Sequence, residues 1–147
     1  MEKTVNTRVI FSAVRKGVLN TVQPSEIITF TDTETNIGNG MNPDTGDFIV
    51  PVSGIYSFSL SALTHFDSQT IPWTKIGVYK NGNFQLAIED RNFDDMKNDQ
   101  NLANIGFSWM LELAQDDQIF LRMDGTNGLE VNQGNYVWFN GQLLYGQ

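Results

Sequence analysis

The feature that most constrains the fold of this chain is an alternation of apolar and small polar residues with a period of two. It is clearest over residues 56–62, where four apolar side chains are separated by three serines. Successive side chains of a β-strand point to opposite faces of the sheet, so this segment would place its apolar groups in a core and its hydroxyls outside. The same alternation recurs over 105–113 and 119–123. The pattern predicts antiparallel β-strands with one buried face.

Shorter apolar runs and turn signals complete the predicted series of strands. These runs lie at 9–14, 27–30, 48–51, 75–79 and 84–88, and residues 136–145 carry large side chains on both faces. Asn81-Gly82 stands between two of the runs and predicts a β-hairpin. We find no helical periodicity of useful length. Many short strands separated by turns predict an all-β antiparallel sandwich or barrel, with a jelly roll as one option.

Length and composition exclude several classes of protein. The chain has 147 residues, enough for one domain with its own core. It contains no cysteine and a single histidine, which excludes disulfides, thiol nucleophiles and metal sites built from thiolates or imidazole clusters. The formal charge of −8 argues against nucleic acid as a partner. Residues 48–66 carry no charge, but Pro51, Gly54 and several serines interrupt them, which argues against membrane insertion.

The order of the strands predicts where the loops gather. In a series of antiparallel strands, alternate connections lie at the same end. Residues 65–73, 90–101 and 124–135 should therefore share one end, which would collect many of the acidic side chains. The Asn81-Gly82 hairpin, the Asp116-Asp117 turn and the C-terminus should share the other. Loops on a rigid scaffold often carry binding residues, so we expect the binding site at the first end.

A series of short motifs resembles a known family. The motifs lie at 11–13, 28–30, 36–38, 46–51, 54–58, 77–79, 81–82, 111–113, 117–119 and 139–144. Together they resemble the globular head domain of complement component 1q, over about residues 8–145. The resemblance implies a ten-stranded antiparallel jelly roll like that of tumour necrosis factor, assembled as a homotrimer and without enzymatic activity. Residues 1–7 would be an N-terminal extension and residues 8–147 the domain.

The candidate binding residues come from the three loops at the first end. An aromatic ring can stack on a sugar ring while carboxylates and amides bind its hydroxyls; the alternative is that the rings pack on the rim of the sandwich or on a trimer neighbour. The candidates are Phe66, Asp67, Trp73, Phe93, Asp94, Asp95, Asp99, Asp124, Asn127 and Tyr136. Calcium prefers oxygen ligands, and a candidate set comprises Asp94, Asp95, Asp99, Asp124 and Glu130. The alternative for these acids is a solvated loop.

The resemblance also directs the expected function. The chain has no Gly-X-Y repeat and so lacks the collagen stalk of the complement protein, which makes it similar to head-only members found among invertebrate secreted defence proteins. We therefore expect a secreted, extracellular recognition protein whose leader is absent from this chain. Its expected partners are other copies of itself and glycans or other microbial surface molecules, bound in a lectin-like way in innate immunity. The alternative is a tumour necrosis factor-like ligand for a cell-surface protein receptor.

Overall fold

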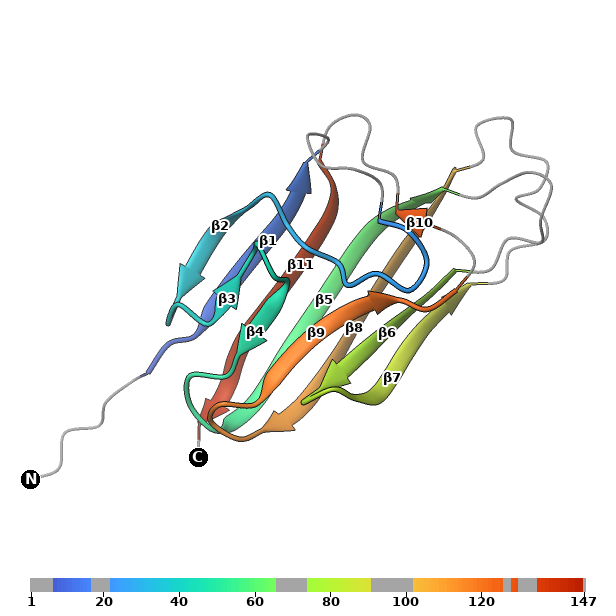
Figure 1. The fold of residues 1–147 in the computed structure, drawn as a ribbon. Helices are drawn as coiled ribbons and strands as arrows, with labels where there is room; N and C mark the ends of the chain where they lie inside the picture. The colour runs from blue at the N-terminus through green and yellow to red at the C-terminus, as the bar shows by residue number, and fades with distance from the viewer. Residues whose placement is uncertain are drawn as a thin grey trace, which may run out of the picture.

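The computed structural model describes residues 7–16, 22–65, 74–90, 102–125, 128–129 and 135–146 as two antiparallel sheets packed face to face (Figure 1). Sheet A runs in the order β2, β1, β11, β5, β8, with the short β10 also paired to β5. Its strands are β2 (Asp32–Ile37), β1 (Ile10–Lys16), β11 (Asn135–Gly146), β5 (Gly54–His65), β8 (Leu102–Leu113) and β10 (Gly128–Leu129). Sheet B contains β3 (Met41–Asn42), β4 (Asp47–Ile49), β9 (Gln118–Met123), β6 (Thr74–Lys80) and β7 (Asn83–Asp90), in that order.

This arrangement confirms the predicted fold class. Five strands in each sheet make the expected ten-stranded jelly roll, and the two-residue β10 pairs with the last residues of β5, beyond the point where β11 pairs with it. Among the described residues, no helix is long and apolar enough to cross a membrane. Residues 1–6 of the predicted N-terminal extension lie outside the described ranges.

The period of two places the core as expected. The four apolar residues of the alternating run 56–62 in β5 are at most 3 % exposed, and they are Tyr56, Phe58, Leu60 and Ala62. The rings of Tyr56 and Phe58 join a cluster of aromatic side chains between the sheets, in which the ring centroid of Phe11 lies 4.7 Å from that of Phe48 and 5.0 Å from that of Phe139. Rigid, closely packed rings hold the two sheets in one relative position.

One glycine is required by this packing. Gly141 of β11 faces the core, and a Cβ built there would collide with the Phe11 ring and come within 3.0 Å of the Phe58 ring. Because real Cβ atoms do not approach other atoms so closely, any larger residue at this position would have to displace a ring. The glycine therefore permits the close approach of β11 to the aromatic cluster.

The ends of the strands confirm the predicted grouping of the loops. At one end, His65 of β5 pairs with Leu102 of β8 and with Gly128 of β10. Thr74 of β6 pairs with Asp90 of β7 at the same end of sheet B. The strands that flank the loops 65–73, 90–101 and 124–135 therefore end at the same side of the sandwich, along the top and upper right of Figure 1.

The opposite end holds the hairpin and the C-terminal residues, as predicted. The side-chain amide of Asn81 donates to Asp117 Oδ1 at 2.9 Å, and the backbone amide of Gln118 donates to Asn81 Oδ1 at 2.9 Å. Asn81 also has a φ of 53°, a left-handed conformation that asparagine tolerates better than most residues. Gly146 pairs with Gly54 at this end. The hairpin turn and the turn at Asp117 are thus joined by side-chain hydrogen bonds.

One expected strand is wrong. The run at 27–30 forms only an isolated bridge between Ile27 and Arg122, and Ile28 and Phe30 are buried without joining a ladder. Their backbone amides donate instead to Leu121 and Pro43. The run is apolar because it covers the edge of the core.

Candidate functional site

The predicted binding residues fall mostly on segments whose structure is not described. Phe66, Asp67, Trp73, Phe93, Asp94, Asp95, Asp99, Asn127 and Glu130 lie outside the described residues. Tyr136 belongs to β11, where only its backbone is described, and Asp124 is described in full. Within the described ranges no group of three or more histidine, aspartate or glutamate side chains is arranged to hold a metal ion. The calcium set therefore stays a prediction about the loops.

Asp124 has partners for both of its carboxylate oxygens. It follows directly after β9, where the next loop begins. The Tyr79 hydroxyl donates to Oδ2 at 2.6 Å, and Arg122 Nε donates to Oδ1. Its backbone amide donates to the carbonyl of Lys75 at 2.7 Å, and its side chain is only 9 % exposed. In this structure the carboxylate anchors the end of β9 to β6.

The surroundings of Asp124 explain how this acid is held. Gly77 lies beneath it, and a Cβ at that position would collide with Asp124 Oδ2 and come within 2.7 Å of the Tyr79 ring. The Arg122 guanidinium lies 4.6 Å from the Tyr79 ring centroid, in a cation–π arrangement. Burial, followed by the hydrogen bond to Asp124, raises the pKa of Tyr79. The hydrogen bond to Asp124 raises the pKa of Arg122. The site therefore favours a protonated tyrosine beside an ion pair.

Sequence reasoning missed Tyr79, Arg122 and Gly77 as members of this anchor. One signal was available: a glycine in the middle of a strand often marks a place where another group approaches closely. The partner of that close approach could not be read from the sequence, because Asp124 is separated from Tyr79 by 45 positions.

The outer face of sheet A carries two rows of uncharged side chains that cross all five long strands. Cross-strand partners lie on the same face, so the register defines each row. The first row contains Ile37, Ile10, Gln142, Ser57 and Met110. The second row contains Thr35, Ser12, Asn140, Ser59 and Ser108. Below we call them the mixed row and the hydroxyl row.

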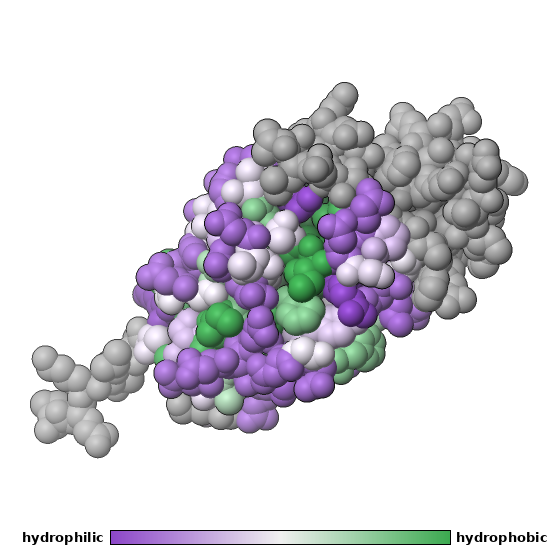
Figure 2. Space-filling model, viewed as in Figure 1, coloured by the Kyte–Doolittle hydropathy of each residue, from purple (hydrophilic) through white to green (hydrophobic). Residues whose placement is uncertain are grey.

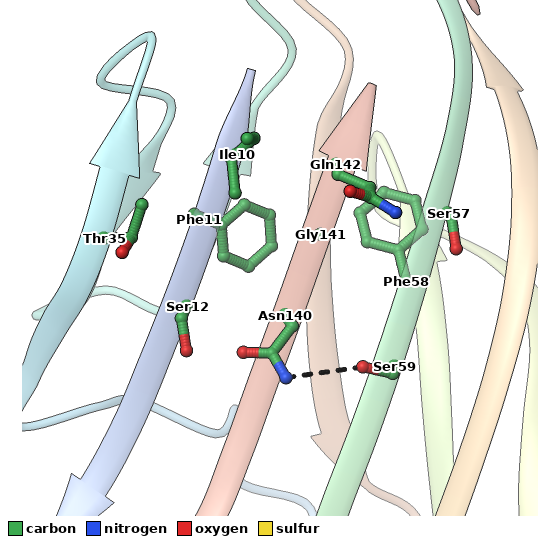
Figure 3. A pocket seen from close by; sticks show the side chains of 10 residues that line it. All are labelled: Ile10, Phe11, Ser12, Thr35, Ser57, Phe58, Ser59, Asn140, Gly141 and Gln142. Atoms are coloured by element: carbon green, nitrogen blue, oxygen red, sulfur yellow. Dashed lines mark hydrogen bonds between the residues drawn. The ribbon is translucent and has the colours of Figure 1, made fainter. Parts of the chain in front are cut away.

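A shallow cavity of about 280 Å³ lies between these rows (Figure 3). Hydroxyl and amide groups surround it, and the rings of Phe11 and Phe58 contribute to its lining. The Asn140 side chain lies in it with the amide nitrogen toward β5, where it donates to Ser59 Oγ at 3.4 Å. Asn140 Oδ1 is on the β1 side, is buried, and has no hydrogen-bond partner among the described residues. An unpaired buried acceptor is unusual enough to require a physical explanation.

The outer face of sheet B differs in character. Figure 2 shows this face with hydrophilic side chains over most of it and apolar side chains between them near the middle. Ile27 and Ile49 are each 40 % exposed, and Phe84 is 51 % exposed. Lys75 Nζ lies 5.4 Å from the Phe84 ring centroid. The face combines cations with exposed apolar surface.

Comparison with known proteins gives consistent matches. The family model described as "C1q domain" matches residues 10–144. The human protein "Complement C1q tumor necrosis factor-related protein 3" is 32 % identical over 118 residues, which are 80 % of this chain and 44 % of that protein. The mouse protein of the same name is 31 % identical over the same shares. The chain thus spans less than half the length of these relatives.

A solved structure with low sequence identity to this chain has a similar fold. The structure titled "Globular Domain of Zebrafish Complement 1qA protein" has a TM-score of 0.70 and 19 % sequence identity to this chain. The match covers 95 % of this chain and 99 % of the zebrafish chain. The jelly roll observed here is therefore similar to that globular domain along nearly its whole length.

Proposed function

This chain belongs to the C1q domain family, and from that premise we propose that it is a secreted, trimeric recognition protein that binds glycans or other microbial surface molecules. The family is non-enzymatic, its domains typically form trimers, and its proteins are typically secreted. The observation that carries the proposal is that the strands flanking three long connections all end together on a rigid sandwich. Scaffolds of this kind commonly bind ligands through such loops.

The proposed trimer strengthens weak recognition. Each copy would present the same group of loops, and a surface ligand that engages one copy would meet the others at high effective concentration. Binding of repeated sugars would therefore exceed the affinity of any single site by a large factor. The contacts of Asp124 support ligand binding through the loops, because they fix the end of β9, where one of the loops begins.

In this proposal, calcium would be bound mainly by acidic residues of the loops. The candidate ligands are Asp94, Asp95, Asp99 and Glu130, with Asp124. Because Asp124 already accepts from Tyr79 and Arg122, the loop acids would have to supply most of the oxygen shell.

A second candidate function is a ligand for a cell-surface protein receptor. The face of sheet B supports it, since Phe84 and Ile49 are exposed apolar side chains and Lys75 lies over the Phe84 ring. Protein interfaces combine apolar and aromatic contacts at their centre with a polar rim. Two relatives also carry "tumor necrosis factor-related" in their names.

The test is an array of glycans and microbial polysaccharides, probed with calcium and with chelator. The variant Asp94→Ala/Asp95→Ala should lose binding while light scattering still reports a trimer. Asp44→Ala removes an exposed acid from a turn outside these loops, and should bind like the wild type. Chelator-sensitive binding would support calcium, and unchanged binding of the double variant would remove that loop from the site. If the protein binds no glycan but binds cells, and Phe84→Ala abolishes that binding, the receptor function is favoured.

A further inference from the structure

Two turns of the chain carry the same dipeptide, an asparagine followed by a glycine. Asn39-Gly40 lies between β2 of sheet A and β3 of sheet B, and Asn81-Gly82 lies between β6 and β7. Asn39 and Asn81 have φ angles of 55° and 53°, a left-handed conformation that asparagine tolerates better than most residues. Gly82 has a φ of 81°, and a Cβ at Gly40 would come within 2.6 Å of the Ile49 carbonyl oxygen. The fold therefore favours this dipeptide at both turns.

An asparagine followed by a glycine can lose its side-chain amide without an enzyme. Hydroxide removes the proton of the following backbone amide, whose nitrogen then attacks the asparagine Cγ. The bond from Cγ to the side-chain nitrogen breaks, and that nitrogen takes a proton from water and leaves as ammonia. Water then opens the resulting cyclic imide at either carbonyl to give aspartate or isoaspartate, and nothing is oxidised. The side chain must be free to turn onto the following nitrogen, which glycine leaves open because it has no Cβ.

The two turns differ in how the asparagine side chain is held. The side-chain nitrogen of Asn81 donates to Asp117 Oδ1 at 2.9 Å, and Asn81 Oδ1 accepts from the backbone amide of Gln118 at 2.9 Å. Both hydrogen bonds must break before Asn81 Cγ can turn onto the next nitrogen, and the bond to the charged Asp117 is the stronger kind. Asn39 is exposed, and within the described ranges its side chain makes no hydrogen bond and the Gly40 amide donates to no backbone carbonyl.

A third pair of this kind is an internal control. Asn140-Gly141 lies within β11, where Asn140 stands in the middle of the hydroxyl row. Both residues are paired with β1 on one side and with β5 on the other, and Asn140 also donates to Ser59 Oγ at 3.4 Å. A backbone held by ladders on both sides cannot bring Cγ onto the following nitrogen without opening the sheet. In the fourth pair, Asn127 lies outside the described residues.

We propose that Asn39 is a site of spontaneous deamidation in the folded protein, and that the hydrogen bonds of its side chain protect Asn81 from the same reaction. The product adds one negative charge to a chain whose formal charge is −8. Isoaspartate also lengthens the main chain within a turn where Asn36 Nδ2 donates to the Met41 carbonyl at 2.8 Å and Asn36 Oδ1 accepts from the Met41 amide at 3.2 Å. The added atom strains these bonds, so the modification weakens the connection between the two sheets.

The test is incubation of the full chain over days at mildly alkaline pH, followed by peptide mapping with tandem mass spectrometry, which assigns deamidation to individual residues. Asn39 should react at least about tenfold faster than Asn81 and Asn140, because a hydrogen bond to a charged acceptor lowers the reactive population by about that factor. In concentrated urea the three residues should react at similar rates, because only the dipeptide remains. The rate at Asn39 should rise with pH, since the nucleophile is the deprotonated amide.

Two variants separate the reaction from the protection. Asn39→Gly keeps the left-handed backbone without the reactive amide, so its urea midpoint should fall less on incubation than that of the wild type. Asp117→Ala removes one partner of Asn81 and should raise the deamidation rate of Asn81 about tenfold. An unchanged rate in a folded Asp117→Ala variant would refute the protection. If Asn39 reacts no faster than Asn81 in the folded wild type, while both react alike in urea, the proposal is overturned without recourse to any variant.

Discussion

Removal of the Tyr79 hydroxyl tests the anchor at the end of β9. The hydroxyl donates to Asp124 Oδ2 at 2.6 Å, and the Asp124 side chain is 9 % exposed, so water replaces the lost donor poorly. A hydrogen bond to a charged group contributes about 1.5–3 kcal/mol, and we expect Tyr79→Phe to lower the free energy of unfolding by roughly that amount. For a domain of about 150 residues this corresponds to a fall in Tm of roughly 3–12 °C. The ring contacts with Phe120 and Arg122 remain in the variant, so the change isolates the hydroxyl.

The assay is thermal and urea unfolding at one fixed protein concentration, because assembly makes Tm depend on concentration. Tyr145→Phe is the matched control, since Tyr145 is 66 % exposed and its hydroxyl loss should change stability by less than about 0.5 kcal/mol. In an Asp124→Ala background the Tyr79→Phe substitution should cost much less, because its partner is already gone. A Tyr79→Phe variant as stable as Tyr145→Phe would refute the reasoning.

The anchor also has a pH dependence with a defined sign. Burial and the hydrogen bond to Asp124 raise the pKa of Tyr79 above its ordinary value of 10.0. A pKa raised by folding contributes stability that is complete below the unfolded pKa and is lost as pH rises through the folded pKa. The stability difference between wild type and Tyr79→Phe should therefore be constant below about pH 10 and shrink above it.

Two further predictions concern the packing and the hairpin. Gly141→Ala should lower the free energy of unfolding by about 1–3 kcal/mol, because its Cβ would collide with the ring of Phe11. At Gly106, the Leu60 carbonyl at 3.8 Å is the one atom of the described residues within 4 Å of an added Cβ, so Gly106→Ala should cost little. Urea midpoints compare the two variants. The hydrogen bond from Asn81 lowers the pKa of Asp117, so this stability is present above about pH 4 and lost as pH falls below it. In Asn81→Gly, the urea midpoint should therefore fall less steeply with decreasing pH below about pH 4 than it does in the wild type. An equally steep fall in the variant would contradict this.

The strands that were predicted well are those with one strictly buried face. The alternation in β5 predicted which face of the strand is buried, including Tyr56, Phe58, Leu60 and Ala62. A strand with one face in the core and one in solvent alternates apolar and polar residues along its sequence. β2 (Asp32–Ile37) was missed by periodicity because its residues are polar on both faces, and it lies at the edge of sheet A. The apolar run at 27–30 was assigned wrongly for the opposite reason: it covers the core without joining a ladder.

The grouping of the strand ends was predictable from the sequence, whereas the contacts of Asp124 were not. The order of strands and turns was enough to group the loops, because antiparallel connection fixes which ends meet. Asp124 was correctly placed at the beginning of one loop, but its partners Tyr79 and Arg122 were not foreseen. Hydrogen bonds between β9 and β6 depend on register, which the sequence pattern does not specify closely enough.

The sequence by itself determined the fold class, the grouping of the strand ends and the family, since these depend on periodicity, turn residues and local motifs. Only the tertiary structure decided what individual side chains do once distant strands meet. It placed Asp124 against Tyr79, although 45 positions separate them, and among the described residues it gave the buried Asn140 Oδ1 no hydrogen-bond partner. The physical reason is that a hydrogen bond, or a buried atom without one, depends on which residues of distant strands become neighbours. Both arise from cross-strand register and sheet packing, and no single segment of the chain carries them.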